Sequence, residues 1–470
     1  MPRKPYDPLP QLIEFASSLR FEDLPPHVVH EAKRRVIDAL GCSLASLSDK
    51  RMMHLARSLC RDDKVSLLQI GGLALGTRKR LHLESAAFLN STMIRWLDWN
   101  DTYLAQEPAH PSDNLGMPFA LAETRKISGK ALILAAVIAY DIQCRLCEAA
   151  SLRARGWDHV NYILISATLA GARCMGMSRQ EMYDAVAFAL NSNAALRQAR
   201  EGKTLSEQKN MAAGDAVRAA MWALRKTWLG LHGPDEIMLG KHGFIKHLSG
   251  RMQKNAFGDL GTRFLLPETY IKKWPVEYHA QTVVAQALEM RAAMPDLRLD
   301  QIERVVITTY EAAVSIIGGE AKRRPLTKET ADHSIYFAFA TALKEGELTL
   351  SQYCDETYQD PAILSLMDKI ELRDEPRYTK QYQAPPSERS FPSHIAIYTK
   401  NGFSYASFML HPPGHPRNPL SDSELNEKFV ACSAGVSGRS WTRGEQDALE
   451  KPWHLEDVED VRAVLPRNWY

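Results

Sequence analysis

The sequence predicts a mainly α-helical fold with a smaller α+β part in its second half. Residues 1 to about 266 carry apolar residues at helical spacing and show no strand-like alternation of any length. After Pro267, β-branched residues and a hairpin signal appear, and a polar helical pattern returns in the C-terminal tail. A chain of 470 residues is also too long for one ordinary hydrophobic core, so two domains are expected.

The N-terminal region is expected to form a compact helical bundle. The run from Val28 to Leu47 follows Pro25-Pro26, and proline suits the first turn of a helix. Small residues such as Ala167 and Gly171 allow neighbouring helices to approach closely. Apolar runs predict four further helices, over 129–149, 162–175, 182–190 and 211–228.

The strand signals come after this bundle. Three strands and two helices are predicted there, over 305–310, 395–399, 403–408, 280–294 and 336–343. Asn401-Gly402 suits a type I′ hairpin turn between the last two strands. We expect a helical domain over 1–267, a smaller α+β domain over 268–407 and C-terminal helices over 408–470. A capping box at Ser421-Asp422-Ser423-Glu424 opens the first of these helices.

Charge and hydropathy exclude several classes of partner. The formal net charge is +2, so there is no overall electrostatic case for binding nucleic acid or an anionic membrane. The N-terminus is proline-rich and has no apolar core of a secretory signal, and the longest apolar stretch, Ala131 to Tyr140, is too short to span a bilayer. We therefore expect a soluble, cytoplasmic protein.

The cysteines also indicate a reducing compartment. The seven cysteines are scattered and odd in number. Cys144 and Cys147 form a single C-x-x-C inside an apolar helical run, which favours two core thiols over a redox or metal site. No grouping of cysteines looks able to hold the iron–sulfur cluster of an aconitase-type dehydratase. The fingerprints of dinucleotide binding, of the P-loop and of zinc proteases are absent as well.

The segment from Arg95 to Gly116 has the richest chemistry. It gathers carboxylates, a histidine, hydroxyls and amides in a loop whose prolines stop helix continuation. Such a loop can place several polar groups around one point. The alternative is a surface loop whose Asp and Asn side chains cap their own backbone, and composition alone does not separate the two.

Four further segments place polar groups at predicted helix starts. Gly156-Trp157-Asp158-His159 precedes one apolar helix, and a histidine there has a lowered pKa and can act as a neutral base. The others are 206–210 with Lys209, 272–281 with His279, and 330–336. The 272–281 segment lies at the predicted domain junction, where ligand sites concentrate. Taken singly, each of these side chains is more often an ordinary capping or solvated group.

Together these segments resemble the MmgE/PrpD family almost from end to end. The sharpest match is R-W-L-D-x-N-D-T followed by H-P-S-D-N-L-G within 95–116. The W-P-V-E-Y-H-A-Q and T-A-D-H-S runs agree with the same branch, that of the 2-methylcitrate dehydratases. The resemblance implies a large helical domain built from both chain ends, a smaller α+β domain, and a homodimer. It also implies a small tricarboxylate substrate and no metal or organic cofactor.

The resemblance also supplies candidate site residues. They are Asp98, Thr102, His110, His159, Lys209, His279 and Tyr336, the last being the loosest match. Dehydration needs a base for a carbon-bound proton and an acid for the departing hydroxyl, with positive groups to hold the carboxylates. Our hypothesis assigns proton abstraction to His159 or His110, without choosing between them. Lys209 and His279 would bind substrate carboxylates. Asp98 would orient a histidine, and Thr102 and Tyr336 would contact the substrate.

Two other functions stay open at this level. The same residues could serve a cis-aconitate decarboxylase, or another lyase or isomerase acting on a polycarboxylate. A non-catalytic helical dimer that binds metabolites is the third interpretation, and the combination of three histidines with a lysine argues against it.

Overall fold

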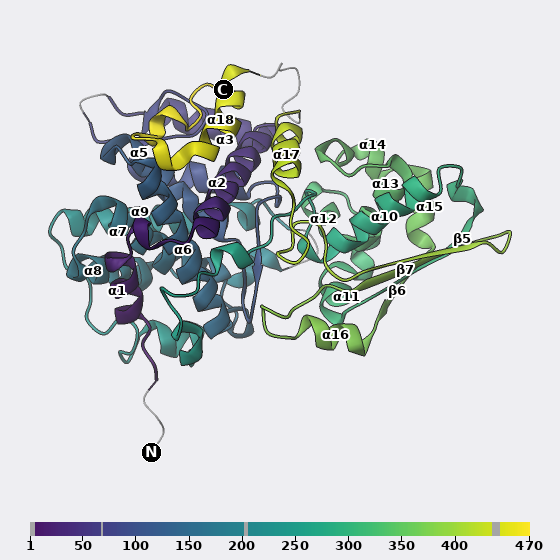
Figure 1. The fold of residues 1–470 in the computed structure, drawn as a ribbon, viewed down its shortest axis with the longest axis horizontal. Coiled ribbons are helices and arrows are strands. Elements are labelled where there is room, and N and C mark those ends of the chain that lie inside the picture. The colour runs from purple at the N-terminus through teal and green to yellow at the C-terminus, as the bar shows by residue number, and fades with distance from the viewer. Residues whose placement is uncertain (1–4, 67–68, 202–204, 435–441) are drawn as a thin grey trace. The chain divides into compact units, whose positions relative to one another are not determined.

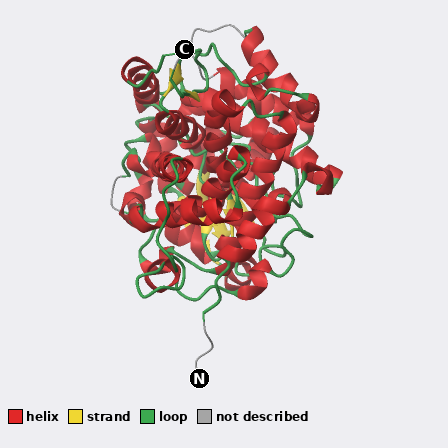
Figure 2. Ribbon diagram, turned by 90° about the vertical axis from the view of Figure 1, so that its left-hand side faces the viewer, coloured by secondary structure: helices red, strands yellow, loops and turns green. Residues whose placement is uncertain are grey.

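The computed structural model describes residues 5–66, 69–201, 205–434 and 442–470. Helices account for most of the described chain and strands for little of it, as Figure 2 shows. The predicted mainly α fold with some sheet is therefore confirmed. By internal contacts the chain divides into two compact units. Unit 1 comprises Met1–Arg200, Gln208–Thr269 and Asp422–Tyr470, and unit 2 comprises Glu201–Glu207 and Tyr270–Ser421.

Unit 1 is a helical bundle. Its helices are α1 (Leu9–Ser18), α2 (Pro26–Ser46), α3 (Lys50–Asp62), α4 (Leu83–Arg95), α5 (Gly116–Arg125), α6 (Gly129–Ala149), α7 (Ile163–Met175), α8 (Arg179–Ser192), α9 (Gln208–Trp228), α17 (Asp422–Ala434) and α18 (Arg443–Glu450). All five helices predicted in the first half are confirmed, α6 with the predicted bounds. Two antiparallel pairs of two-residue strands, β1 (Gly72–Leu73) with β2 (Arg80–Leu81) and β3 (Tyr103–Leu104) with β4 (Pro108–Ala109), were not predicted, because two residues are too few to show alternation.

Close helix packing in unit 1 depends on small residues. A Cβ at Gly214 on α9 would lie 2.1 Å from Thr92 Oγ1 on α4, and one at Gly171 on α7 would lie 2.6 Å from Leu224 Cδ1. These helices can approach only where a side chain is missing, as the sequence predicted for Gly171. Cys144 and Cys147 are fully buried in α6, and burial raises the pKa of both thiols. This burial agrees with the favoured interpretation of the C-x-x-C as two core thiols.

Segments from both ends of the chain meet inside unit 1. Helix α17, yellow in Figure 1, packs along α2, which is purple. At Gly41 of α2 an added Cβ would lie 3.1 Å from Phe429 Cδ2 of α17, so the absence of a side chain there lets the two helices approach. Elements separated by almost the whole chain thus share one core.

Unit 2 contains a four-stranded sheet in the order β6-β5-β7-β8. Its strands are β5 (Ile302–Thr309), β6 (Ile370–Asp374), β7 (Ser393–Thr399) and β8 (Ser404–Met409). Strand β5 runs parallel to β6 and antiparallel to β7. The predicted strand at 305–310 and the predicted hairpin are confirmed, whereas β6 was missed.

The hairpin turn is not of the predicted type I′. Among the described residues of the turn only Gly402 has a positive φ, of 84°, whereas a type I′ turn requires one at Asn401 as well. The amide of Gly402 donates to Thr399 O, and the amide of Thr399 donates to Phe403 O. This is a three-residue loop with a type I turn and a glycine bulge. The Asn401 carboxamide oxygen accepts a hydrogen bond from Thr399 Oγ1, and this contact favours the type I turn over the type I′ turn.

Seven α-helices complete the described part of unit 2. They are α10 (Gln281–Ala293), α11 (Glu311–Ile317), α12 (Lys328–Ala331), α13 (Ile335–Glu345), α14 (Asp355–Tyr358), α15 (Pro361–Asp368) and α16 (Pro376–Tyr382). Helices α10 and α13 match the two predicted helices. The core of the unit joins apolar side chains of α10, α13 and α15 to those of β5 and β7.

The expected domain boundaries and those of the units differ most near residue 408. The segment after β8 stays with unit 2 because Ile271 N donates to Gly414 O, and Phe391 N to Leu410 O. Among the helices of the described chain, none combines the length and hydropathy that crossing a bilayer requires.

Candidate active site

The loop between α4 and α5 is buried. Residues 96–104 and 111–115 are shielded from solvent, so the alternative of a surface loop is wrong. Asp98 has a φ of 56°, in the left-handed region that a side chain other than glycine adopts only at some cost. Contacts of its carboxylate must therefore help to hold the loop in this shape.

Asp98 lies between two cations. Arg95 Nη1 donates to Asp98 Oδ1 at 2.8 Å, and Lys209 Nζ donates to Asp98 Oδ2 at 3.0 Å. None of these three residues is more than 3% exposed. Lys209 belongs to the first turn of α9, so the pairing joins that helix to the loop. Asp98 thus holds two cationic side chains of the unit in place.

A second group of polar side chains follows Asp98 in the loop. Asn100 Nδ2 donates to Ser112 Oγ at 2.9 Å and to Asp113 Oδ1 at 3.1 Å, and the amide of Ser112 donates to Asp101 Oδ1 at 3.0 Å. Burial raises the pKa of Asp101, and it raises that of Asp113 to about 8 against the opposing charge of Arg95. Asp113 is therefore largely protonated at neutral pH.

His159 begins a 3₁₀ turn (His159–Tyr162) that leads into α7, with Asp158 as N-cap. Its Nδ1 lies 3.2 Å from Asp158 Oδ1, and its Nε2 is buried with no hydrogen-bond partner within the described chain. Burial, reinforced by Arg200, lowers the pKa of His159 to about 3. A helix start was the expected cause of a lowered pKa, but burial is the main one.

Asp158 is itself held by Arg200. The guanidinium Nε donates to Asp158 Oδ2 at 2.7 Å. Burial opposes ionisation of this carboxyl, but Arg200 outweighs it and lowers the pKa of Asp158 to about 2. An ionised Asp158 favours the proton on Nδ1 of His159, which leaves the lone pair on Nε2.

His110 lies beside His159. The centres of the two rings are 5.7 Å apart in an edge-to-face arrangement. His110 Nδ1 lies 2.7 Å from the carbonyl oxygen of Asp101, which can only accept a hydrogen bond. In the neutral form both rings thus present a basic Nε2, as a proton acceptor requires.

Thr102 has a structural contact in the same loop. Its hydroxyl donates to Ala109 O at 3.0 Å, beside the β3–β4 pair, and the residue is buried. Towards a ligand this hydroxyl can therefore act only as an acceptor, for example of a substrate hydroxyl.

In unit 2, His279 is enclosed by aromatic side chains. Its Nδ1 lies 2.7 Å from Tyr310 Oη, and the rings of Tyr310 and Tyr382 each lie 5.4 Å from its ring centre. Glu277 caps this turn by accepting from the amide of His279 at 2.7 Å, and its Oε1 lies 3.8 Å from Nε2. Burial keeps Tyr310 protonated by raising its pKa well above the usual value.

Tyr336 is a core residue of the same unit. It is 2% exposed, its hydroxyl donates to Gly318 O at 2.7 Å, and the Arg323 guanidinium lies 3.9 Å from its ring centre. These contacts support a packing role for Tyr336, and its predicted contact with the substrate stays a prediction.

The structure brings four of the predicted residues together within unit 1. His110 and His159 are neighbours, and Asp98 pairs with Lys209. Arg95 binds Asp98, and its positive charge also contributes to the lowered pKa of His159. His279 and Tyr336 belong to unit 2.

Sequence reasoning missed several residues of these clusters. Asp158 carries a signal, since an aspartate directly before a helix start is a typical N-cap. Arg200 and Tyr310 carry none, because each reaches its partner from a distant part of the chain. The carboxylate that lies against His159 is that of Asp158, and the expectation that Asp98 orients a histidine stays a prediction.

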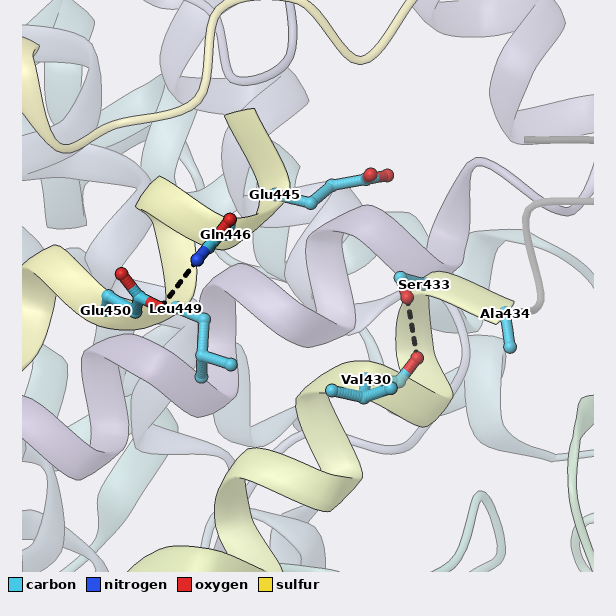
Figure 3. Close-up of a pocket in the computed structure, with 7 residues that line it drawn as sticks. All are labelled: Val430, Ser433, Ala434, Glu445, Gln446, Leu449 and Glu450. Atoms are coloured by element: carbon cyan, nitrogen blue, oxygen red, sulfur yellow. Dashed lines mark hydrogen bonds between the residues drawn. The ribbon is translucent and has the colours of Figure 1, made fainter. Parts of the chain in front are cut away.

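A surface pocket between α17 and α18 is a different feature. Val430, Ser433 and Ala434 line it from α17, and Glu445, Gln446, Leu449 and Glu450 from α18 (Figure 3). None of the seven predicted site residues lines it. Two of its polar groups are already engaged, since Gln446 donates to Glu450 at 2.9 Å and Ser433 to Val430 O at 2.6 Å. The pocket therefore has no claim to be the active site.

Comparison with known families and proteins bears on these clusters. The family model of the MmgE/PrpD N-terminal domain matches residues 10–256, and that of the MmgE/PrpD C-terminal domain matches residues 274–451. A 2-methylcitrate dehydratase of Salmonella typhi is 32% identical over 434 residues, covering 88% of this chain and 87% of the relative.

Two further relatives carry similar names. A 2-methylcitrate dehydratase of Cupriavidus necator is 29% identical, covering 85% of this chain and 84% of the relative. A mitochondrial 2-methylcitrate dehydratase of Yarrowia lipolytica is 30% identical, covering 84% of this chain and 78% of the relative.

Proposed function

Because this chain belongs to the MmgE/PrpD family, we propose that it is a hydro-lyase that dehydrates 2-methylcitrate to 2-methyl-cis-aconitate without a metal. The names of the three relatives given above, each a 2-methylcitrate dehydratase, support the reaction class and the substrate. Their similarity extends over most of this chain.

One observation carries the proposal: a buried imidazole beside a buried cationic cluster. Nε2 of His159 has no hydrogen-bond partner among the described residues, and Arg95 with Lys209 supplies positive charge in the same unit. A neutral base next to positive charge suits the removal of a proton α to a carboxylate, because negative charge then develops on the substrate.

In the proposed reaction, Nε2 of His159 or of His110 takes the carbon-bound proton, and the electron pair forms the double bond. The hydroxyl leaves as water after it receives a proton from an acid, for which the protonated Asp113 is a candidate, with a protonated His110 as a second candidate when His159 is the base. Lys209 and His279 bind substrate carboxylates, and Thr102 accepts from the substrate hydroxyl. Asp98 holds Lys209 and Arg95 in place.

The pKa of His159 bears on this choice of base. A pKa of about 3 makes the free imidazole neutral but weakly basic. A bound polyanion would raise that pKa, since a nearby negative charge favours the imidazolium. We therefore expect no titration of His159 between pH 5 and 8 in the profile of kcat/KM, which reports on the free enzyme.

A substrate panel in the presence of chelator tests substrate class and metal independence together. The protein is incubated with 2-methylcitrate, citrate or cis-aconitate, and both the absorbance of the unsaturated acid and released CO₂ are followed. We expect absorbance from 2-methylcitrate and no CO₂. CO₂ from cis-aconitate would instead indicate the decarboxylase. Ligand-induced thermal stabilisation without turnover would indicate a binding protein, and activity lost to chelator would refute the metal-free mechanism.

Single histidine variants test the mechanism. General acid–base groups contribute about 10²–10⁴-fold to rate, so His159→Ala and His110→Ala should each lower kcat by that order. His54→Ala is the control, because His54 is exposed on α3. If both site variants lose less than about tenfold, neither histidine takes part in the chemistry.

Three organisational proposals accompany the function. Unit 1 and unit 2 are proposed to be the large helical domain, formed from both chain ends, and the smaller α+β domain. The protein is proposed to be a homodimer, for which the exposed Trp228, Leu229 and Leu231 at the end of α9 offer an apolar surface. Light scattering after gel filtration tests this. A cytoplasmic location stays a prediction, since one relative is named as mitochondrial.

A further inference from the structure

The C-terminal helix α17 sends one charged side chain into the interior of unit 1. Lys428 is 5% exposed, and its Nζ donates to Asp38 Oδ1 on α2 at 2.5 Å and to Trp99 O at 2.9 Å. The same Nζ lies 5.5 Å from the centre of the Trp99 ring. A buried ammonium is costly unless it is paired, so the position of Lys428 is determined by these contacts.

The carbonyl that Lys428 binds belongs to the loop of the candidate active site. Trp99 directly follows Asp98, whose left-handed backbone and two cationic partners are described above, and directly precedes Asn100. A hydrogen bond to this carbonyl restrains the peptide that connects Asp98 to the Asn100–Asp113 pair.

Lys428, with its hydrogen bonds to Asp38 and to Trp99 O, forms what we call the Lys428 tether, and its ammonium group is charged at neutral pH. Burial alone would lower the pKa of Lys428, but Asp38 outweighs it and the net shift is upward. The ammonium therefore stays protonated and can donate to the carboxylate and the carbonyl together.

We propose that Lys428 is a positioning residue for the dehydration, which holds the Asp98 loop in its working shape from the far end of the chain. This inference rests on the proposed function. Lys428 acts through Trp99 and has no contact with the substrate. A helix that is remote in sequence would thus set the geometry of Asp98 and, through it, of Lys209.

The chain provides a matched control for this tether. Lys33 on α2 also binds one carboxylate and one backbone carbonyl of the C-terminal segment, Glu456 Oε1 and Trp453 O, each at 2.8 Å. It is 8% exposed, and none of its hydrogen bonds or ion pairs within the described chain involves the loop 96–115. Lys33→Met and Lys428→Met therefore remove the same kind of contact, but only the second reaches the site.

The test compares kcat, stability and local protection in three variants at a temperature where all are folded. Misplacement of site groups by about 1 Å costs on the order of 10²-fold in rate, so Lys428→Met should lower kcat by about 10–100-fold. Lys33→Met should lose stability but keep the parent kcat. Asp38→Asn/Lys428→Met removes both charges, so it should regain stability while kcat stays low.

Recovery of kcat together with stability in the double variant would overturn the proposal, as would an equal loss of kcat in Lys33→Met. Hydrogen exchange of peptides covering residues 96–104 gives a readout that needs no turnover. Protection there should fall in Lys428→Met and not in Lys33→Met, and unchanged protection in Lys428→Met would refute the tether. If the parent protein itself has no activity on 2-methylcitrate, the proposed function fails while the tether is still tested.

Discussion

Replacing Asp98 by asparagine tests the charge arrangement on which the candidate site depends. The carboxylate receives Arg95 at 2.8 Å and Lys209 at 3.0 Å, and all three residues are buried. At an effective dielectric constant of about 20, one such pair gains about 5–6 kcal/mol before desolvation is counted. Loss of one partner from a buried ion pair costs about 3–5 kcal/mol net. Asp98→Asn should therefore lower the free energy of unfolding by that amount, measured by urea denaturation.

Two further variants make the test specific. Asp98→Asn/Lys209→Met also removes one of the two cations that Asp98 binds, so it should regain at least about 1 kcal/mol over Asp98→Asn alone. Asp62→Asn is the control, because Asp62 and its partner Arg61 are 59% and 69% exposed and the pair is screened by water; its unfolding midpoint should not move. A loss below about 1 kcal/mol in Asp98→Asn, or losses that simply add in the double variant, would refute the reasoning.

Three other outcomes are expected. Folding lowers the pKa of His159 from 6.5 to about 3, so the contribution of the neutral imidazole to stability is fully present above pH 6.5 and is lost as the pH falls towards 3. His159→Gln should therefore flatten the dependence of the melting temperature on pH over this range. An unchanged slope would contradict this reasoning. Gly214→Ala should lower the free energy of unfolding by about 1–3 kcal/mol, because the added methyl overpacks the contact between α4 and α9. Gly444→Ala in α18 is the control: its Cβ would lie 3.8 Å from the nearest atom, Thr442 Oγ1, so chemical denaturation should show a neutral or stabilising effect. Tyr310→Phe removes one hydrogen bond to His279, worth about 1 kcal/mol, so kcat should fall about fivefold, and an unaltered kcat would exclude Tyr310 from orienting that ring.

The helical part of the fold was predictable because its signals are local. The apolar run over 129–149 reproduces α6 residue for residue, and Asn401-Gly402 marks the hairpin. The turn type was missed because Asn401 has a competing side-chain contact with Thr399. Strand β6 was missed because only Ile370 of its five residues is buried, so it shows little apolar alternation, and its parallel pairing with β5 is not visible in the sequence.

The candidate site was likewise predictable only in part. Motif order identified His110, His159, Asp98 and Lys209, and the structure places these four in one unit. It did not predict that Asp98 would bind cations, nor that Asp158 would be the carboxylate beside His159. Such pairings depend on which side chains face each other after folding.

The sequence by itself determined the helical class, the strand-bearing segment, the core thiols and the family, because each depends on residue spacing or on motifs in order. Only the tertiary structure decided the protonation states and ion pairs of the site residues. The neutral His159, the protonated Asp113 and the tether from Lys428 to Trp99 follow from burial and from contacts between distant segments. The free energy of a charge depends on its surroundings, and folding alone creates those surroundings.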